Sequence, residues 1–165
     1  MATWADIQNW DHAYVIEAEN LIEDELREAR DIVADLEFAS KDIRSVGKAP
    51  DKMRNRLSKI QKGLDSRINE LTEYALATAE LHGYVSRVVA MRESAYEVAA
   101  ELKETIPESG YVMTPPMELS NNPDRYEKYQ DLHACIKSAV DLATEAETTV
   151  GPRFKALADG QYTMS

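Results

Sequence analysis

The sequence has little of what builds disulfide-bonded, metal-binding or disordered proteins. It contains one cysteine, Cys135, so the chain has no internal disulfide and no zinc site built on paired cysteines. Glycine and proline number six each among 165 residues, and hydrophobic residues make up 44%. This is the composition of a folded chain and not of a disordered tail. We expect an ordered protein in a reducing compartment, or one that is indifferent to redox state.

Long hydrophobic runs are also missing. No stretch approaches about 18 consecutive apolar residues, the length typical of a membrane-spanning helix. The segment Met1–Asp6 has neither the basic start nor the apolar core of a signal peptide. We therefore expect no membrane association and a location in the cytoplasm, or within a particle assembled there.

Motifs for catalysis and nucleotide binding are missing as well. The sequence has no phosphate-binding loop, dinucleotide fingerprint, calcium loop or serine-centred elbow. It also has no Glu-x-x-His pair, which would place two metal ligands on one helix face. We predict no cofactor, no bound metal and no enzymatic activity. A helical-bundle enzyme or metal carrier that uses His82, His133 and Cys135 is the least favoured alternative.

What the sequence does have is a seven-residue repeat. Residues 4–46 contain no Pro or Gly, and small or apolar residues recur there at Val15, Ile22, Ala29, Leu36 and Ile43. Residues 51–106 carry the same repeat on two tracks. The first track is Leu57, Leu64, Leu71, Thr78, Val85, Arg92, Ala99 and Ile106. The second track is Ile60, Arg67, Tyr74, Leu81, Val88, Ala95 and Leu102. Each stretch is therefore predicted to be one long amphipathic helix with a coiled-coil-like seam.

The C-terminal third predicts a loop and one more long helix. Residues 107–122 are too rich in Pro and Asn for regular structure. Asn122 followed by Pro123 is a cap with a proline in the first turn, which predicts a helix over residues 123–150. A short helical turn is expected over 153–158. The apolar side chains of the loop are expected to dock on the helices: Tyr111, Val112, Met113, Met117 and Leu119.

These helices predict an all-α fold formed by a single elongated domain over residues 1–165. Because the connection Gly47–Pro50 is short, the first two helices must be antiparallel, with paired residues whose numbers add to about 97. The third helix packs along the second at the open end of this long antiparallel hairpin. We expect an elongated three-helix bundle from which residues 25–73 project as a two-helix arm.

Charge is distributed unevenly along the chain, which has a net charge of −11. Residues 1–46 hold 12 acidic and 4 basic residues, whereas residues 47–70 hold 3 acidic and 7 basic ones. We expect the acidic run of the first helix to pair with the basic run of the second across the hairpin. The basic run has no interleaved aromatic residues, so nucleic acid is not an expected partner.

A two-helix arm leaves part of its apolar surface uncovered. The residues expected to form a partner-binding seam there are Ile32, Leu36, Leu57, Ile60 and Leu64. We predict a non-enzymatic structural or adaptor component of a larger protein assembly, such as a virion or a secretion apparatus, whose partners are copies of itself or other proteins. The alternative is an acidic binding module or inhibitor that presents Glu23, Asp24 and Glu28 to a basic partner, or that mimics nucleic acid.

Overall fold

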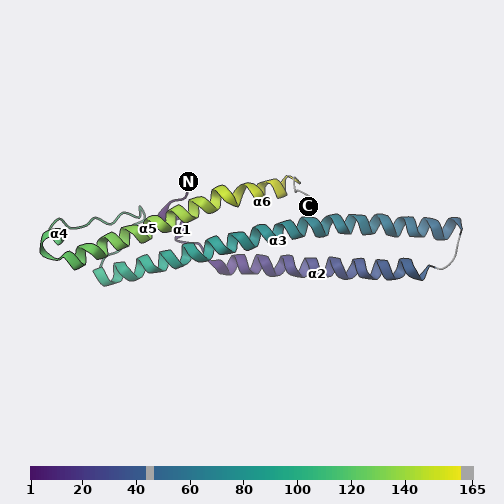
Figure 1. Cartoon of the computed structure of the whole chain (residues 1–165), viewed down its shortest axis with the longest axis horizontal. Helices are drawn as coiled ribbons and strands as arrows, with labels where there is room; N and C mark the ends of the chain where they lie inside the picture. The colour runs from purple at the N-terminus through teal and green to yellow at the C-terminus, as the bar shows by residue number, and fades with distance from the viewer. Residues whose placement is uncertain (44–46, 161–165) are drawn as a thin grey trace. The chain divides into compact units, whose positions relative to one another are not determined.

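The fold is all-α, as predicted. The computed structural model describes residues 1–43 and 47–160, and none of these residues belongs to a strand. The described helices are α1 (Trp4–Ile7), α2 (His12–Asp42), α3 (Lys48–Leu102), α4 (Glu118–Asn121), α5 (Pro123–Thr149) and α6 (Gly151–Ala158) (Figure 1). Within the described ranges, no helix combines the length and the apolar character needed to cross a membrane.

The chain divides into two compact units. Unit 1 comprises residues 1–16 and 80–153, and unit 2 comprises residues 17–79 and the chain from Phe154 onward. Both α2 and α3 pass from one unit into the other without a break in the helix. The division therefore does not test the prediction of a single domain, which stays a prediction.

The expectation of one helix over residues 4–46 is wrong at residues 8–11, which separate α1 from α2. Thr3 and Asp6 form a capping box at the start of α1. The Asp11 side chain accepts a hydrogen bond from the backbone N–H of Ala13 at 2.9 Å, just inside α2. Short polar side chains such as Asp compete with helical hydrogen bonds in this way, so they favour a new helix start. The expected end of this helix, at residues 44–46, lies outside the described residues.

Helix α3 is shifted from its predicted bounds of 51–106 at both ends. It begins at Lys48 because Pro50 is tolerated in a first turn, where no intrahelical donor is needed. It continues through Gly63 and Gly83. It ends at Leu102 because Lys103 adopts a left-handed φ of 56° and the N–H of Glu104 donates to the Ala99 carbonyl at 2.9 Å, a typical C-terminal cap.

The remaining elements follow the sequence closely. Asn122 caps α5 as predicted, because its Oδ1 accepts a hydrogen bond from the N–H of Arg125 at 3.2 Å. The short α4 lies inside the predicted loop, and α6 begins two residues before the expected turn at 153. Val112 is buried as expected. Tyr111 is exposed but its ring stacks on His133 of α5. Met113 and Met117 are exposed, so the expectation that these two side chains are covered is wrong, and the side chain of Leu119 lies outside the described part of the loop.

In unit 1, α5 runs antiparallel beside the C-terminal part of α3 (Figure 1). The phenol of Tyr129 donates a hydrogen bond to Glu104 at 2.6 Å, and the phenol of Tyr84 donates one to Glu145 at 3.1 Å. Apolar side chains of α1, α3 and α5 form one core. Its fully buried large members are Trp4, Ile7, Val88, Leu102, Tyr129 and Leu132.

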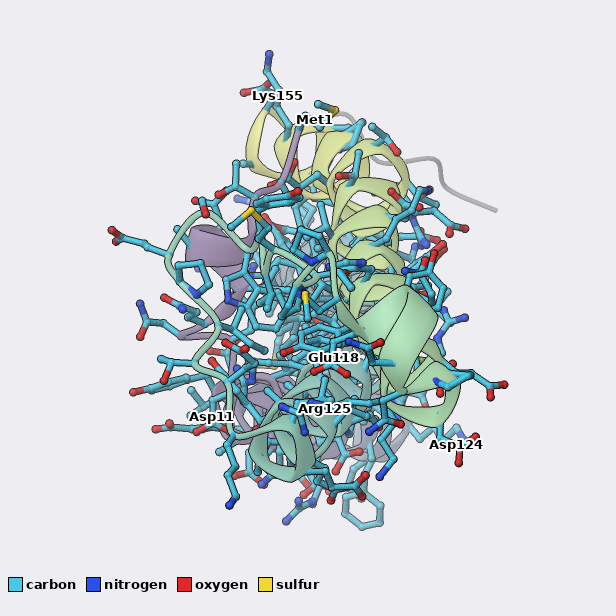
Figure 2. The ribbon with its side chains drawn as sticks, turned by 90° about the vertical axis from the view of Figure 1, so that its left-hand side faces the viewer. Met1, Asp11, Glu118, Asp124, Arg125 and Lys155 are labelled. Atoms are coloured by element: carbon cyan, nitrogen blue, oxygen red, sulfur yellow. The ribbon has the colours of Figure 1, made fainter. Side chains whose placement is uncertain are left out.

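Arg125 holds together three elements at one end of unit 1. Its Nε donates to Glu118 of α4 at 3.0 Å, and Figure 2 shows the two side chains next to each other. Its Nη2 donates to the carbonyl of Leu102 at 2.7 Å, at the end of α3. A guanidinium at this position satisfies a carbonyl that the helix itself leaves without a partner.

In unit 2, α2 and the N-terminal part of α3 form the predicted antiparallel hairpin (Figure 1). Arg67 contacts Glu25 at 3.0 Å, and the Gln61 amide donates to Glu37 at 3.3 Å. Arg54 donates to the carbonyl of Ile43 at 2.8 Å. The last two contacts join residues whose numbers add to 98 and 97, close to the predicted value, and the first joins residues whose numbers add to 92.

Candidate functional site

Two grooves lie on the two sides of the unit 2 hairpin, each lined by both helices. The seam groove, of about 260 Å³, is lined by apolar Ala29, Ile32, Leu64 and Leu71 and by charged Glu25, Glu28 and Arg67. The far groove, of about 370 Å³, is lined by Glu19, Glu23, Leu26, Arg30, Thr72, Ala75, Leu76 and Ala79. Leu26 and Arg30 of the far groove follow Glu25 and Ala29 of the seam groove by one residue, which is about 100° around α2, so the two grooves lie on different sides of the helix pair.

The five predicted seam residues differ in how exposed their side chains are. Ile32 and Ile60 are 41% and 53% exposed, whereas Leu36, Leu57 and Leu64 are half-buried. The sequence analysis missed Met53, which is 56% exposed. Met53 stands seven residues before Ile60, so it could have been found by extending the second track back by one repeat.

The second track of α3 is covered in unit 1 and largely uncovered in unit 2. In unit 1 its members Val88, Ala95 and Leu102 are buried in the core that α5 completes. In unit 2, the ring of Tyr74 contacts Phe154 of α6, with 6.3 Å between ring centroids. Met53 and Ile60, earlier on the same track, remain exposed. The apolar residues of the second track are therefore buried where α5 packs on them in unit 1 and exposed at Met53 and Ile60 in unit 2.

On each helix of the hairpin, a set of charged residues at helical spacing precedes, by one position in the sequence, a set of mainly apolar residues. In α2, Asp24, Glu28, Asp31 and Asp35 form the acidic edge, and each is followed by a residue of the row Glu25, Ala29, Ile32 and Leu36. In α3, Lys52, Arg56 and Lys59 form the basic edge, and each is followed by Met53, Leu57 or Ile60. All of these charged side chains are exposed. The spacing of three or four residues places each row on one helix face.

Both edges lie on the outer sides of the hairpin. Successive residues of a helix lie about 100° apart around its axis, so Glu37 lies about 100° from Leu36, and Gln61 about 100° from Ile60. Glu37 and Gln61 lie toward the other helix, because their side chains meet across the hairpin. The residues that precede Leu36 and Ile60 must lie on the opposite side, away from the other helix. These residues are Asp35 and Lys59.

The predicted pairing of acidic and basic runs within the hairpin is confirmed only for Arg67 and Glu25, among the residues that the structure describes. Arg54 instead pairs with Asp51 in its own helix. The side chains of six members of the two edges take part in no ion pair or hydrogen bond within the described ranges: Glu28, Asp31, Asp35, Lys52, Arg56 and Lys59. The outward direction of both edges explains why they do not reach each other.

The predicted acidic face is not brought together. Glu23 lines the far groove, whereas Glu28 lines the seam groove. Asp24 forms an ion pair with Arg27 of the same helix at 2.7 Å. The continuous acidic surface is the acidic edge, in which Asp31 and Asp35 of the predicted acidic run join Asp24 and Glu28. Its signal was the same spacing of three and four residues that identified the apolar row.

The residues proposed for an enzyme or metal carrier are not assembled into a site by unit 1. In the part of the chain that the structure describes, no group of three or more His, Cys, Asp or Glu side chains could hold a metal ion. The ring of His133 stacks on Tyr111, and its Nε2 lies 2.5 Å from the Val112 carbonyl oxygen. Burial raises the pKa of the Cys135 thiol, which lowers the fraction of the reactive thiolate at neutral pH.

The sequence matches no protein-family model, and it has no significant match among curated proteins or solved structures. A function therefore has to be inferred from the surface itself. We call the exposed apolar residues Ile32, Met53 and Ile60, with the half-buried Leu64 and the seam groove, the seam face. It is bordered on one side by the acidic edge and on the other by the basic edge.

Proposed function

We propose that this protein is a non-enzymatic structural or adaptor component of a larger protein assembly, and that it joins the assembly through helix–helix contacts of the seam face. The observation that carries the proposal is the second track of α3, whose apolar residues are buried in unit 1 and exposed at Met53 and Ile60 in unit 2. The proposed assembly is of the virion or secretion-apparatus kind and forms in the cytoplasm.

Covering the seam face stabilises a complex through the hydrophobic effect. Complete burial of a Met or Ile side chain contributes about 1.5–3 kcal/mol. Ile32, Met53 and Ile60 are already about half buried in the single chain. Covering each of them therefore contributes roughly 1 kcal/mol, to which the rest of the contact adds.

An aspartate at position 60 is expected to remove the chain from its assembly. Ile60→Asp places a charge where a partner helix must pack, and burial of an unpaired charge is strongly unfavourable. In extracts of cells that produce the protein, the wild-type chain should elute in a complex several times its own mass, and the variant should elute as a single chain. Size-exclusion chromatography with light scattering measures both.

Leu76→Asp is the matched control for this experiment. Leu76 lies on the same helix and is 55% exposed, close to the 53% of Ile60, but it lines the far groove. This variant should keep the mass of the wild-type complex. The proposal fails if the wild-type chain elutes alone from the extract, or if the two variants lose the complex equally.

Glu28, Asp31 and Asp35 of the acidic edge, whose side chains have no ion-pair partner among the described residues, support a second candidate function, an acidic binding module for a basic partner. In that case charge reversal at Glu28 should abolish binding, whereas Ile60→Asp should have little effect. Raising the salt concentration should also weaken the complex steeply, because exposed charges are screened within about 8–10 Å at ordinary ionic strength. The assembly function predicts the opposite order of the two variants.

A further inference from the structure

We infer that the partner of the seam face is a second copy of this chain, and that two hairpins pack face to face as a four-helix bundle in which α2 of each copy lies against α3 of the other. This inference rests on the proposed function and names its partner. The charges that border the seam face favour this partner and this packing.

The acidic edge and the basic edge make the seam face complementary to itself. The acidic edge runs along the outer side of α2 and the basic edge along the outer side of α3, with the apolar rows between them. Symmetric dimers use the same surface patch on both copies. A two-fold axis parallel to the helices places α2 of one copy over α3 of the other, so each acidic edge meets a basic edge.

The other face-to-face arrangement is disfavoured by the same charges. A two-fold axis perpendicular to the helices places α2 over α2 and α3 over α3. The acidic edge would then meet a second acidic edge, and the basic edge a second basic one. Like charges placed together across an interface oppose association. The sequence thus selects one of the two packings.

The parallel axis also fixes which residues meet. Rotation about an axis along the helices leaves every residue at its own height, so the register between copies equals the register within one hairpin. In that register Glu37 meets Gln61 and Glu25 meets Arg67. Across the dimer, Asp35 should therefore lie beside Lys59 of the other copy. The side chains of Asp35 and Lys59 have no ion-pair or hydrogen-bond partner among the described residues of their own copy.

Association should respond to charge exchange in a way that only this packing explains. Lys59→Glu places a glutamate beside Asp35 of the other copy, twice per dimer, and we expect dissociation about tenfold stronger, within the range of exposed ion pairs. Asp35→Lys together with Lys59→Glu in the same chain restores opposite charges, and affinity should return to within about threefold of wild type. Sedimentation of the purified chains at micromolar concentrations measures all three, and circular dichroism checks that each is folded.

Cross-linking tests the geometry directly. Cysteines are introduced into a Cys135→Ser background, one chain carrying Asp35→Cys and the other, isotopically labelled, carrying Lys59→Cys. A short bismaleimide should join labelled to unlabelled chains in the mixture. It should not join the Asp35→Cys chain to itself, nor to a Leu76→Cys chain, whose cysteine lies in the far groove.

The outcomes separate this inference from the proposed function. A purified chain that stays single at micromolar concentration, although it elutes in a large complex from cell extracts, overturns the inference and leaves the assembly function standing with another protein as partner. A purified multimer without the cross-link between positions 35 and 59 also overturns it. A chain that is single both when purified and in extracts contradicts the proposed function itself.

Discussion

Gly110→Ala is expected to destabilise the protein by about 2–5 kcal/mol, because a β-carbon at this position is strained by both the backbone and its surroundings. Gly110 has a left-handed φ of 74°, which costs other residues about 1–2 kcal/mol. The added carbon would lie 2.7 Å from Cβ of Trp4 and 3.1 Å from its Cγ. Overpacking of a well-packed core typically costs about 1–3 kcal/mol. Urea denaturation followed by circular dichroism measures the loss.

Gly160→Ala separates the two causes. Gly160 has a φ of 75°, nearly that of Gly110, but its added carbon would meet no atom within 4 Å. The backbone strain is therefore the same and the steric clash is absent, so the loss should be about 1–2 kcal/mol. Equal losses in the two variants would show that the loop around Gly110 does not press on Trp4.

Arg92→Met should also destabilise the protein strongly, by about 2–4 kcal/mol. One nitrogen of Arg92, Nη1, donates to three backbone carbonyls that follow α1: those of Ile7 at 2.9 Å, Gln8 at 3.1 Å and Trp10 at 2.7 Å. The side chain is only 12% exposed, so methionine keeps its packing and leaves these carbonyls without their donor. Trp4 and Trp10 report on this segment through their fluorescence during denaturation.

Two further variants control the Arg92 experiment. Arg92→Lys keeps the positive charge but lacks the planar set of donors, so it should recover only part of the loss. Lys137→Met removes an ion pair with Asp141 that is largely exposed, and such pairs contribute about 0–1 kcal/mol. If Arg92→Met is as stable as Lys137→Met, the three carbonyl contacts do not hold the N-terminal segment in place.

Periodicity predicted the two helices of the hairpin, because long amphipathic stretches repeat one physical requirement many times, and a cap followed by proline predicted the start of α5. The antiparallel hairpin followed from a connection too short for any other arrangement, and the return of α5 along α3 followed from the apolar faces of both. The ends of the helices were harder to predict. Lys103 adopts a conformation usual for glycine, and nothing in a seven-residue repeat signals that α3 stops at Leu102.

Arg92 shows what a repeat cannot reveal. It interrupts the first track of α3, and the sequence offers no reason for a charge at that position. Its partners are the carbonyls of Ile7, Gln8 and Trp10, part of a segment that periodicity assigned to one unbroken helix. A long-range contact with backbone atoms of an irregular segment leaves no pattern in side-chain types.

The candidate site was half predictable. Ile32, Ile60 and Leu64 were identified from the repeat, and Met53 belongs to the same track one repeat earlier. The direction of the charged edges was not predictable, because opposite net charge on two antiparallel helices is compatible with either inward or outward side chains. The contact between Gln61 and Glu37 settles this direction, and the outward edges are what make the seam face self-complementary.

The most direct test of the seam face follows a fluorescent probe on it as copies associate. An environment-sensitive dye is attached at position 53 of a Met53→Cys, Cys135→Ser chain, and its emission is recorded from nanomolar to micromolar protein. The dye should be in water in the dilute chain, since Met53 is 56% exposed, and its emission should shift to shorter wavelength as a second hairpin covers it. The same dye on a Leu76→Cys chain should not shift. An emission at position 53 that stays constant over the whole range, or that shifts equally at position 76, would contradict the inference that a second copy covers the seam face.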